Sequence, residues 1–297
     1  MNACEAKAAR KRVQRYGFSS GNANLRLDFL AESDKRSTFV AEMKSEYAIF
    51  NRTERLVGSG GMQAISAARV IIFGVGGVGS WVAEGLVRSG VARITLVDSD
   101  RVSITNVNRQ CPATTKTIGE VKVNAMKSRL LEINPDAKIE AVEGVYDSTT
   151  CDTFNLESYD YVIDAIDSLE CKALLILKAT SLPRSVKFFS SMGAALKMDP
   201  TKIRVAEFWQ VEGCPLARAL RQRFKRNHLF PARKFQVVYS PEVLPNRGNV
   251  IPVEDDVRQH VDWNARKAQV NGTVAHITAI FGFTLAGLVL QDICADS

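Results

Sequence analysis

The stretch FGVGGVGS, residues 73–80, constrains what this chain can fold into more than any other part of its sequence. It follows the apolar run at residues 70–72 and precedes a predicted helix over residues 80–89. Glycine has no Cβ, so backbone N–H groups in such a loop can approach a phosphate closely, and the helix adds the positive end of its dipole. The residues that we expect to cradle a phosphate group are Gly74, Gly76, Gly77, Gly79 and Ser80. A tight turn that binds no ligand is the alternative.

Strands and helices alternate after this loop. Further strands are predicted at residues 93–97, 138–142, 159–164 and 185–191, with helices at 119–133 and 171–180 between them. This order predicts an α/β fold with a Rossmann-like, mostly parallel sheet and helices on both faces. From about residue 194 the rhythm changes, and we expect extra C-terminal strands and a helix as an elaboration of a single domain at residues 46–297.

Composition sets limits on the rest of the chain. Residues 1–45 are rich in Arg and Lys, which predicts a flexible basic extension or, alternatively, an organellar transit peptide. The segment at 274–290 is nearly uncharged but at the short limit for a membrane span, so we expect a buried core helix and no membrane span. The six cysteines show no C-x-x-C spacing, so no zinc is predicted, and free thiols fit a reducing, cytoplasmic setting.

A polar segment follows the second predicted strand. Asp98 lies about twenty residues beyond the glycine loop, where an acid can bind the ribose of a nucleotide. The sequence DSDRVSITNVNRQ then adds Asp100, Asn106, Asn108, Arg109 and Gln110. In a parallel sheet this segment lies at the carboxyl edge, and an arginine there suits displacement at a nucleoside triphosphate better than hydride transfer. Lys122, in the next predicted helix, is either a second cation for the phosphates or a solvated residue.

Two acidic residues close the fourth predicted strand. Asp164 and Asp167 belong to the sequence VIDAID and are expected at the same edge of the sheet as the glycine loop. Mg²⁺ prefers one or two carboxylates together with phosphate oxygens, so both residues are candidate metal ligands. The alternative for Asp167 is a helix N-cap, in a capping box with Glu170, and the alternative for Asp164 is a turn at the strand end.

The motifs in combination resemble the ubiquitin-activating-enzyme-like, or ThiF-type, adenylating superfamily. The matching stretches are GVGGVGS, LVDSDRVSITNVNRQ, GEVKV and VIDAIDS. The resemblance implies an enzyme that adenylates a carboxylate with Mg·ATP, with Asp98 at the ribose and Asp167 near the metal. It implies that the triphosphate is lined by Asn106, Arg109, Gln110 and Lys122. Arg52 matches an arginine that in this superfamily reaches the partner subunit's ATP site, which implies a homodimer; an ordinary surface arginine is the alternative. The residues implied in catalysis are Arg52, Arg109, Lys122 and Asp167.

Further stretches of the sequence indicate one group within this superfamily. They are FNRTERLVGSGGMQAI, TNVNRQ, VIDAIDS followed by Lys172, VVYSPE and TAIFGF. Together they are similar to the tRNA threonylcarbamoyladenosine dehydratases. This resemblance implies adenylation of the threonine carboxylate of a modified adenosine beside the tRNA anticodon, followed by ring closure through the carbamoyl nitrogen. Some relatives carry a cysteine where this chain has Val237, so no catalytic cysteine is expected. A sulfur-transfer protein is a further candidate partner.

A basic amphipathic helix is predicted at residues 214–228. Its candidate tRNA contacts are Arg218, Arg221, Lys225 and Arg226, with Arg233 and Lys234 after the helix. Basic side chains on one face neutralise phosphates, and Phe235 or Tyr239 could stack on an exposed base. A solvated helix without an RNA partner is the alternative.

Other functions stay open at this point. An activator of a ubiquitin-like sulfur-carrier protein would use the same nucleotide chemistry on a different carboxylate. A nicotinamide-dependent oxidoreductase would use the glycine loop for a dinucleotide. A non-catalytic module that binds tRNA or a protein is the last alternative, because fold alone does not decide function.

Overall fold

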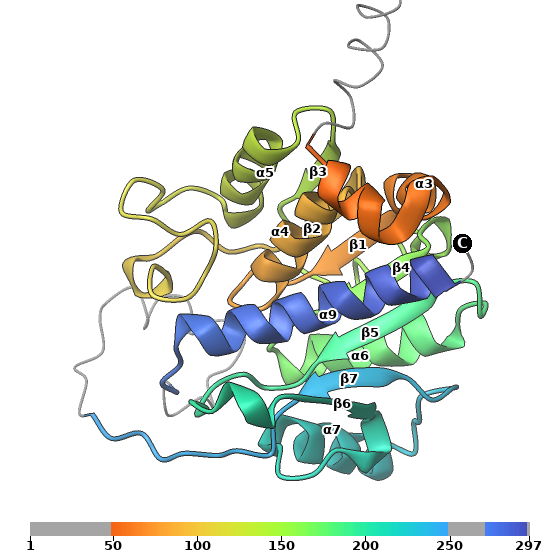
Figure 1. The fold of residues 1–297 in the computed structure, drawn as a ribbon. Coiled ribbons are helices and arrows are strands. Elements are labelled where there is room, and N and C mark those ends of the chain that lie inside the picture. The colour runs from red at the N-terminus through yellow and green to blue at the C-terminus, as the bar shows by residue number, and fades with distance from the viewer. Residues whose placement is uncertain (1–48, 249–270, 296–297) are drawn as a thin grey trace, which may run out of the picture. The chain divides into compact units, whose positions relative to one another are not determined.

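The computed structural model describes residues 49–248 and 271–295 (Figure 1). The chain divides into two compact units, Met1–Asn51 and Arg52–Ser297. The predicted basic extension at residues 1–45 lies outside the described residues. All the described strands belong to the second unit.

A seven-stranded sheet forms the centre of the second unit, in the order β3-β2-β1-β4-β5-β7-β6. Its strands are β1 (Arg69–Phe73), β2 (Arg93–Val97), β3 (Lys138–Val142), β4 (Tyr161–Asp164), β5 (Lys187–Ser191), β6 (Arg204–Glu207) and β7 (Gln236–Tyr239). The neighbouring strands are parallel, apart from the antiparallel edge pair of β6 and β7. The predicted α/β fold with a mostly parallel sheet is therefore confirmed.

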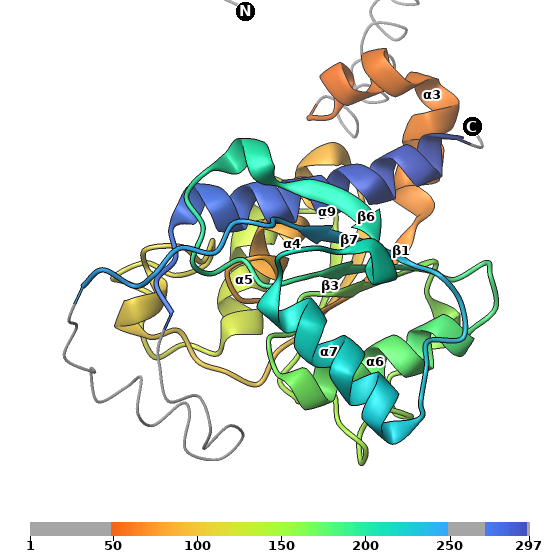
Figure 2. The same ribbon diagram turned by 90° about the horizontal axis from the view of Figure 1, so that it is seen from below.

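Helices cover both faces of this sheet (Figure 2). One face carries α3 (Asn51–Ala67), α4 (Gly79–Ser89), α5 (Lys122–Ile133) and α9 (Ala275–Ala295), and the other carries α6 (Leu169–Ser181) and α7 (Pro215–Asn227). Short 3-10 helices are η1 (Ile104–Asn106), η2 (Leu156–Ser158), η3 (Pro200–Lys202) and η4 (Phe208–Gln210). Successive residues of β1 point to opposite faces, so Ile72 packs in the core beneath α4 and Phe73 in the core beneath α6.

Helix α9 is the core helix predicted near the C-terminus. Its residues Ile277, Phe281, Leu285 and Val289 are fully buried and recur every four residues, so they form one stripe against the sheet and α4. By length and composition, α9 is the one described helix that could cross a membrane, although the core helix of a soluble protein passes the same test. The tilted contact of Phe283 with Trp81 on α4, 5.8 Å between ring centroids, extends this packing to the start of α4.

The strand order reverses at β1, because β2 lies on one side of it and β4 on the other. Ligands of open parallel sheets bind at such a switch point, beyond the carboxyl ends of the strands. Gly74 follows β1, Asp98 follows β2 and Ala165 follows β4. The topology therefore brings the segments that the sequence singled out to one place.

Candidate nucleotide-binding site

The glycine loop leaves β1 in a backbone conformation that favours glycine. Gly74 has φ +85°, and a Cβ there would lie 2.6 Å from the carbonyl oxygen of Ala165. A Cβ on Gly79, the first residue of α4, would overlap the carbonyl oxygen of Gly74. The loop therefore turns tightly against the end of β4, and larger residues at these two positions would force it open.

The loop presents open hydrogen-bond donors. Among the described residues, the N–H groups of Gly76, Gly77 and Val78 donate to no acceptor. They are consecutive and lie immediately before α4, where the helix dipole favours negative charge. This donor set fits the phosphate group predicted from the sequence.

Ser80 joins the glycine loop to the polar segment after β2. Its hydroxyl is buried, donates to the carbonyl of Gly76 at 2.7 Å and accepts from the N–H of Cys111 at 3.1 Å. The hydroxyl of this predicted phosphate-binding residue is thus occupied by the protein itself. Its role in the structure is to keep the loop and Gln110, which precedes Cys111, in fixed relative positions.

Asp98 also contacts the glycine loop. One carboxylate oxygen accepts from the N–H of Val75 at 2.7 Å and the other accepts from the N–H of Asp100 at 2.9 Å. Each carboxylate oxygen can accept a second hydrogen bond. The geometry therefore leaves Asp98 able to bind the hydroxyls of a ribose while it holds the loop against the end of β2.

Lys122, the first residue of α5, is paired in the structure. Its ammonium lies 2.7 Å from a carboxylate oxygen of Asp100, and its side chain is almost fully buried. Burial lowers the pKa of Lys122, but the charges of Asp98 and Asp100 outweigh that effect and raise the pKa overall, so the ammonium stays charged. The charge of Asp167 contributes to the same increase in pKa.

Arg109 and Gln110 lie beside the glycine loop. A Cβ on Gly77 would be 3.7 Å from Cδ of Arg109, and a Cβ on Gly76 would be 3.9 Å from Nε2 of Gln110. The guanidinium of Arg109 donates to the carbonyl of Thr105 at 2.8 Å. Oε1 of Gln110 is buried and has no hydrogen-bond partner within the described part of the chain. A buried polar atom without a partner costs free energy, so this atom indicates a place for a ligand donor.

Asn106 and Asn108 have structural contacts. The Asn106 side chain accepts from the N–H of Ser103 at 3.1 Å in a capping box around η1. Asn108 donates to the carbonyl of Thr273 at 3.0 Å and accepts from Arg109 at 3.0 Å. Both asparagines, predicted as nucleotide ligands, therefore shape the segment that presents Arg109 and Gln110.

Thr278 on α9 was not identified from the sequence as a site residue. Its hydroxyl lies 3.3 Å from the carbonyl oxygen of Arg109, and its methyl group would be 3.1 Å from a Cβ on Gly77. Trp81 donates to the same carbonyl at 3.0 Å. The stretch TAIFGF, which contributed to the family resemblance, was the available signal, but it did not say which part of the site α9 contacts.

The two acids after β4 occupy different environments. Asp164 is fully buried, 2.9 Å from the ammonium of the equally buried Lys172, and it accepts from Ile166 N–H at 3.1 Å and from the Ser190 hydroxyl at 2.7 Å. Of the two roles considered for it, the turn at the strand end is the one that the structure shows. Asp167 is exposed, and the N-cap residue of α6 is Ser168, so the N-cap alternative for Asp167 is wrong. Asp167 remains the candidate metal ligand.

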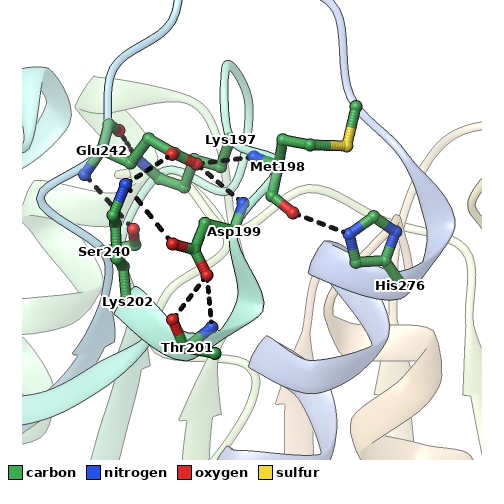
Figure 3. Close-up of polar contacts among 8 residues, drawn as sticks. All are labelled: Lys197, Met198, Asp199, Thr201, Lys202, Ser240, Glu242 and His276. Atoms are coloured by element: carbon green, nitrogen blue, oxygen red, sulfur yellow. Dashed lines mark hydrogen bonds and ion pairs between the residues drawn. The ribbon is translucent and has the colours of Figure 1, made fainter.

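A polar junction holds the loops after β5 and β7 to the start of α9 (Figure 3). The carboxylate of Glu242 accepts from the N–H groups of Met198 and Asp199 at 2.6 and 2.9 Å and lies 3.0 Å from the ammonium of Lys202. These donors lower the pKa of Glu242 to about 2. His276, in the first turn of α9, lies 2.9 Å from the carbonyl oxygen of Met198. No motif in the sequence predicted this junction.

The basic helix α7 is amphipathic as predicted, with Ala217, Leu220 and Phe224 buried. Of its candidate RNA contacts, Arg218, Lys225 and Arg226 are exposed. Arg221 instead donates to the carbonyls of Phe208 and Val211 at 3.1 and 2.8 Å, so the structure contradicts its placement on the solvent face.

Three residues near α7 also have other roles than predicted. Arg233 donates to carbonyls at the end of α6 and just beyond it, including that of Val186 at 2.6 Å. Phe235 and Tyr239 are buried in the core, so the expectation that either ring stacks on a base is wrong. Phe235 directly precedes β7 and Tyr239 is its last residue, and both fill the core beneath α7.

Two buried thiols and the predicted catalytic residue Arg52 complete the description. Burial and the neighbouring Glu84 carboxylate raise the pKa of the Cys111 thiol to about 12, which makes Cys111 a poor nucleophile, and Cys214 is buried. Arg52 is exposed in the first turn of α3, and whether it reaches another subunit stays a prediction.

Comparisons with known proteins agree on one family. The model of the ThiF family matches residues 50–295. A tRNA threonylcarbamoyladenosine dehydratase of Bacillus subtilis is 37% identical over 251 residues, which cover 83% of this chain and 95% of that protein. The crystal structure of an E. coli tRNA N6-threonylcarbamoyladenosine dehydratase in complex with ATP matches with a TM-score of 0.71 and 31% identity, and covers 84% of this chain and 95% of that one.

A relative with a different activity matches less of the chain. The molybdopterin-synthase adenylyltransferase of E. coli is 31% identical over 169 residues, 57% of this chain and 65% of that protein. The dehydratases thus match a larger share of this chain than the adenylyltransferase does. The chain belongs to the ThiF family and, within it, to the tRNA threonylcarbamoyladenosine dehydratases.

Proposed function

We propose that this chain cyclises threonylcarbamoyladenosine in tRNA, next to the anticodon, by an ATP-dependent dehydration. The observation that carries the proposal is the row of open N–H groups at Gly76, Gly77 and Val78 beside Arg109, in a member of the dehydratase family. Open donors and a guanidinium suit the phosphates of a nucleoside triphosphate, whose charge must be neutralised during displacement.

The proposed reaction has two steps. An oxygen of the threonine carboxylate first attacks the α-phosphorus of ATP, and pyrophosphate leaves. The carbamoyl nitrogen then attacks the activated carbonyl carbon and loses its proton, and AMP leaves with the former carboxylate oxygen. The nucleoside loses one water overall while ATP becomes AMP and pyrophosphate. Because the second step is intramolecular, proximity supplies much of its rate.

The residues divide into ligands and supports. In this proposal the loop N–H groups and Arg109 bind the phosphates, Asp98 binds the ribose, and Oε1 of Gln110 accepts from the bound substrate. Lys122 is held by Asp100 and adds positive charge to the site. Asn106, Asn108 and Ser80 act through the positions they give to these ligands.

Mg²⁺ is a further part of the proposal. Among residues 49–248 and 271–295, no group of three or more His, Cys, Asp or Glu side chains could hold a metal ion by itself. Mg²⁺ that arrives with ATP needs only one or two carboxylates, because phosphate oxygens and water supply the remaining ligands. Asp167 is the residue we propose for this role, in which bound Mg²⁺ would offset phosphate charge.

We also propose that the active form is a homodimer in which Arg52 enters the partner's site. Arg52 is exposed on α3, and Leu56, one helical turn later, is 85% exposed. An exposed apolar side chain beside Arg52 supports a subunit interface there.

The tRNA contacts, a protein partner and the location of the protein are the remaining predictions. Arg218, Lys225 and Arg226 are proposed contacts of the tRNA phosphates. A sulfur-transfer protein as partner, a cytoplasmic location and the organellar alternative stay predictions.

One experiment tests the reaction. Protein, ATP and Mg²⁺ are incubated with tRNA that carries the linear modification, and the nucleosides are then analysed by mass spectrometry while AMP is measured. We expect a nucleoside lighter by one water and an equal amount of AMP. Unchanged nucleoside would refute the proposal. Exchange of ATP with pyrophosphate, driven by a small protein with a Gly-Gly tail, would instead indicate a sulfur-carrier activator.

A further inference from the structure

Two aromatic side chains lie exposed on the C-terminal elaboration. Trp209 in η4 and Phe230 beyond α7 contact each other, with ring centroids 6.2 Å apart and an interplanar angle of 39°. Trp209 is 37% exposed and Phe230 is 53% exposed, as is the adjacent Leu229. Clustered apolar side chains at a surface indicate a binding site more often than scattered ones do.

The pair rests on a rigid base. The Trp209 ring lies 5.3 Å from that of Phe208, which stacks on Phe235 at 5.0 Å and contacts Phe224 at 5.9 Å, measured between centroids. Arg221 donates to backbone carbonyls on both sides of Trp209, which ties η4 to α7. A binding surface that is ordered in advance loses less entropy when a ligand binds.

The net charge of the segment that carries the pair indicates the class of partner. Residues 194–248 contain eleven Lys and Arg against four Asp and Glu, a formal charge equal to the +7 of the whole chain. The other residues balance, with 28 of each sign. The excess positive charge is thus concentrated in the elaboration that carries the aromatic pair. A basic surface with exposed rings fits RNA better than an apolar protein partner.

Helix α7 connects the pair to the candidate nucleotide site. A Cβ on Gly193, just after the carboxyl end of β5, would lie 3.7 Å from Cβ of Leu216 in the first turn of α7. Thirteen helical residues span about 20 Å, so α7 leads from that edge of the sheet to Phe230. Arg218 and Lys225 lie two turns apart on its exposed face. Their spacing along the helix is about 10 Å, so they would neutralise phosphates that are more than one nucleotide apart.

We propose that Trp209 and Phe230 form a stacking platform for unpaired tRNA nucleotides that lie away from the modified adenosine, at the edge of the sheet opposite the candidate nucleotide site. The inference rests on the proposed function, because it takes tRNA as the substrate. Nucleotides beside an anticodon lie in a loop, where unpaired bases can stack on aromatic side chains. Stacking tolerates any base, so the platform would add affinity without restricting which anticodon loop binds.

Binding of a fluorescein-labelled anticodon stem–loop RNA, measured by anisotropy without ATP, tests the platform. The variants are Trp209→Ala, Trp209→Phe, Phe230→Ala and Leu229→Ala, with Lys138→Ala at the start of β3 as a charge control. We expect Kd to rise about tenfold or more for the two ring deletions, since each stacked base contributes a factor of about 5 to 150. Trp209→Phe, Leu229→Ala and Lys138→Ala should stay within about threefold of wild type, since none of them removes a stacked base.

The outcomes separate the platform from the reaction. Wild-type affinity in Trp209→Ala, with its thermal unfolding unchanged, would overturn the platform even if ring closure proceeds. Equal losses in Leu229→Ala and Trp209→Ala would overturn it as well, because they would indicate a general apolar surface. RNA binding that depends on the aromatic side chains of Trp209 and Phe230, in a protein that does not cyclise the nucleoside, would support the platform and refute the proposed function. Unchanged ATP binding in the ring variants confirms that the nucleotide site is intact.

Discussion

The buried ion pair between Asp164 and Lys172 gives the sharpest test of how the site is supported. Both side chains are fully buried, and the ammonium of Lys172 also donates to the carbonyl of Ile166 at 2.9 Å. The pair therefore links the end of β4 to the first turn of α6, immediately beside Asp167. Lys172→Met removes the charge and keeps an unbranched side chain of similar length.

The expected cost follows from the burial. Removing one partner of a buried pair leaves an uncompensated charge and costs about 3–5 kcal/mol. In the double variant Asp164→Asn with Lys172→Met no charge stays buried, and the remaining cost is that of the unpaired Ile166 carbonyl, about 1–3 kcal/mol. The double variant should therefore be more stable than Lys172→Met alone by about 2 kcal/mol.

Urea unfolding followed by circular dichroism measures these differences, and ATP consumption is measured over a range of Mg²⁺ concentrations. We expect the double variant to keep the Mg²⁺ dependence of the wild type, because Asp164 has a structural role. A cost below about 1 kcal/mol for Lys172→Met would contradict the reasoning about the pair. A double variant that is stable but needs much more Mg²⁺ would show that Asp164 is a metal ligand after all.

Three other predictions follow from the site. If Arg52 enters the partner's site, a mixture of inactive Arg52→Ala and inactive Arg109→Ala should regain about a quarter of wild-type activity, since half of the dimers carry one intact site; no recovery after subunit exchange contradicts this. Ser80→Ala removes the hydroxyl that donates to the Gly76 carbonyl and accepts from the N–H of Cys111, so KM for ATP should rise about tenfold while Kd for tRNA stays unchanged; an unchanged KM refutes the role of Ser80. The pKa of Glu242 is lowered to about 2 from an ordinary 4.5, so its carboxylate stabilises the fold fully above about pH 4.5 and progressively less as the pH falls toward 2. Glu242→Gln should therefore be less stable than wild type at pH 7, with a difference that vanishes near pH 2 in thermal unfolding; a constant difference would be contrary to this assignment.

Local patterns predicted the part of the site that depends on chain order. The glycine loop has to follow a strand and precede a helix, so β1, the loop and α4 were found from Phe73 to Ser80. Asp98 follows the second strand, and parallel strands bring their carboxyl ends to one edge. The fold class and the gathering of Asp98, Arg109 and the loop were therefore predictable. Their individual contacts depend on distances that no spacing rule contains.

The errors have a common physical origin in long-range contacts. Arg221 lies at a polar position of its helix, but the turn at η4 offers it carbonyl groups, so it points inward. Phe235 and Tyr239 follow a basic segment and looked accessible, yet β7 pairs with β5 and β6 and buries them. From the sequence, Asp164 could be a metal ligand or a residue of the turn at the strand end. The structure adds its buried ion pair with Lys172, eight positions later in the sequence, which no pattern predicted.

The polar junction around Glu242 supports both the candidate nucleotide site and the start of α7, where the proposed tRNA contacts begin. His276 of the junction lies in the first turn of α9, two residues before Thr278, which contacts the Arg109 carbonyl. The neighbouring segment also contacts the start of α7, because a Cβ on Gly213 would lie 2.6 Å from the carbonyl oxygen of Pro241. Displacing Glu242 should therefore weaken ATP and tRNA binding together, whereas a change at Ser80 affects only the nucleotide. Titrations with ATP and with tRNA compare the two variants. If both variants lose affinity for ATP alone, the junction supports only the nucleotide site.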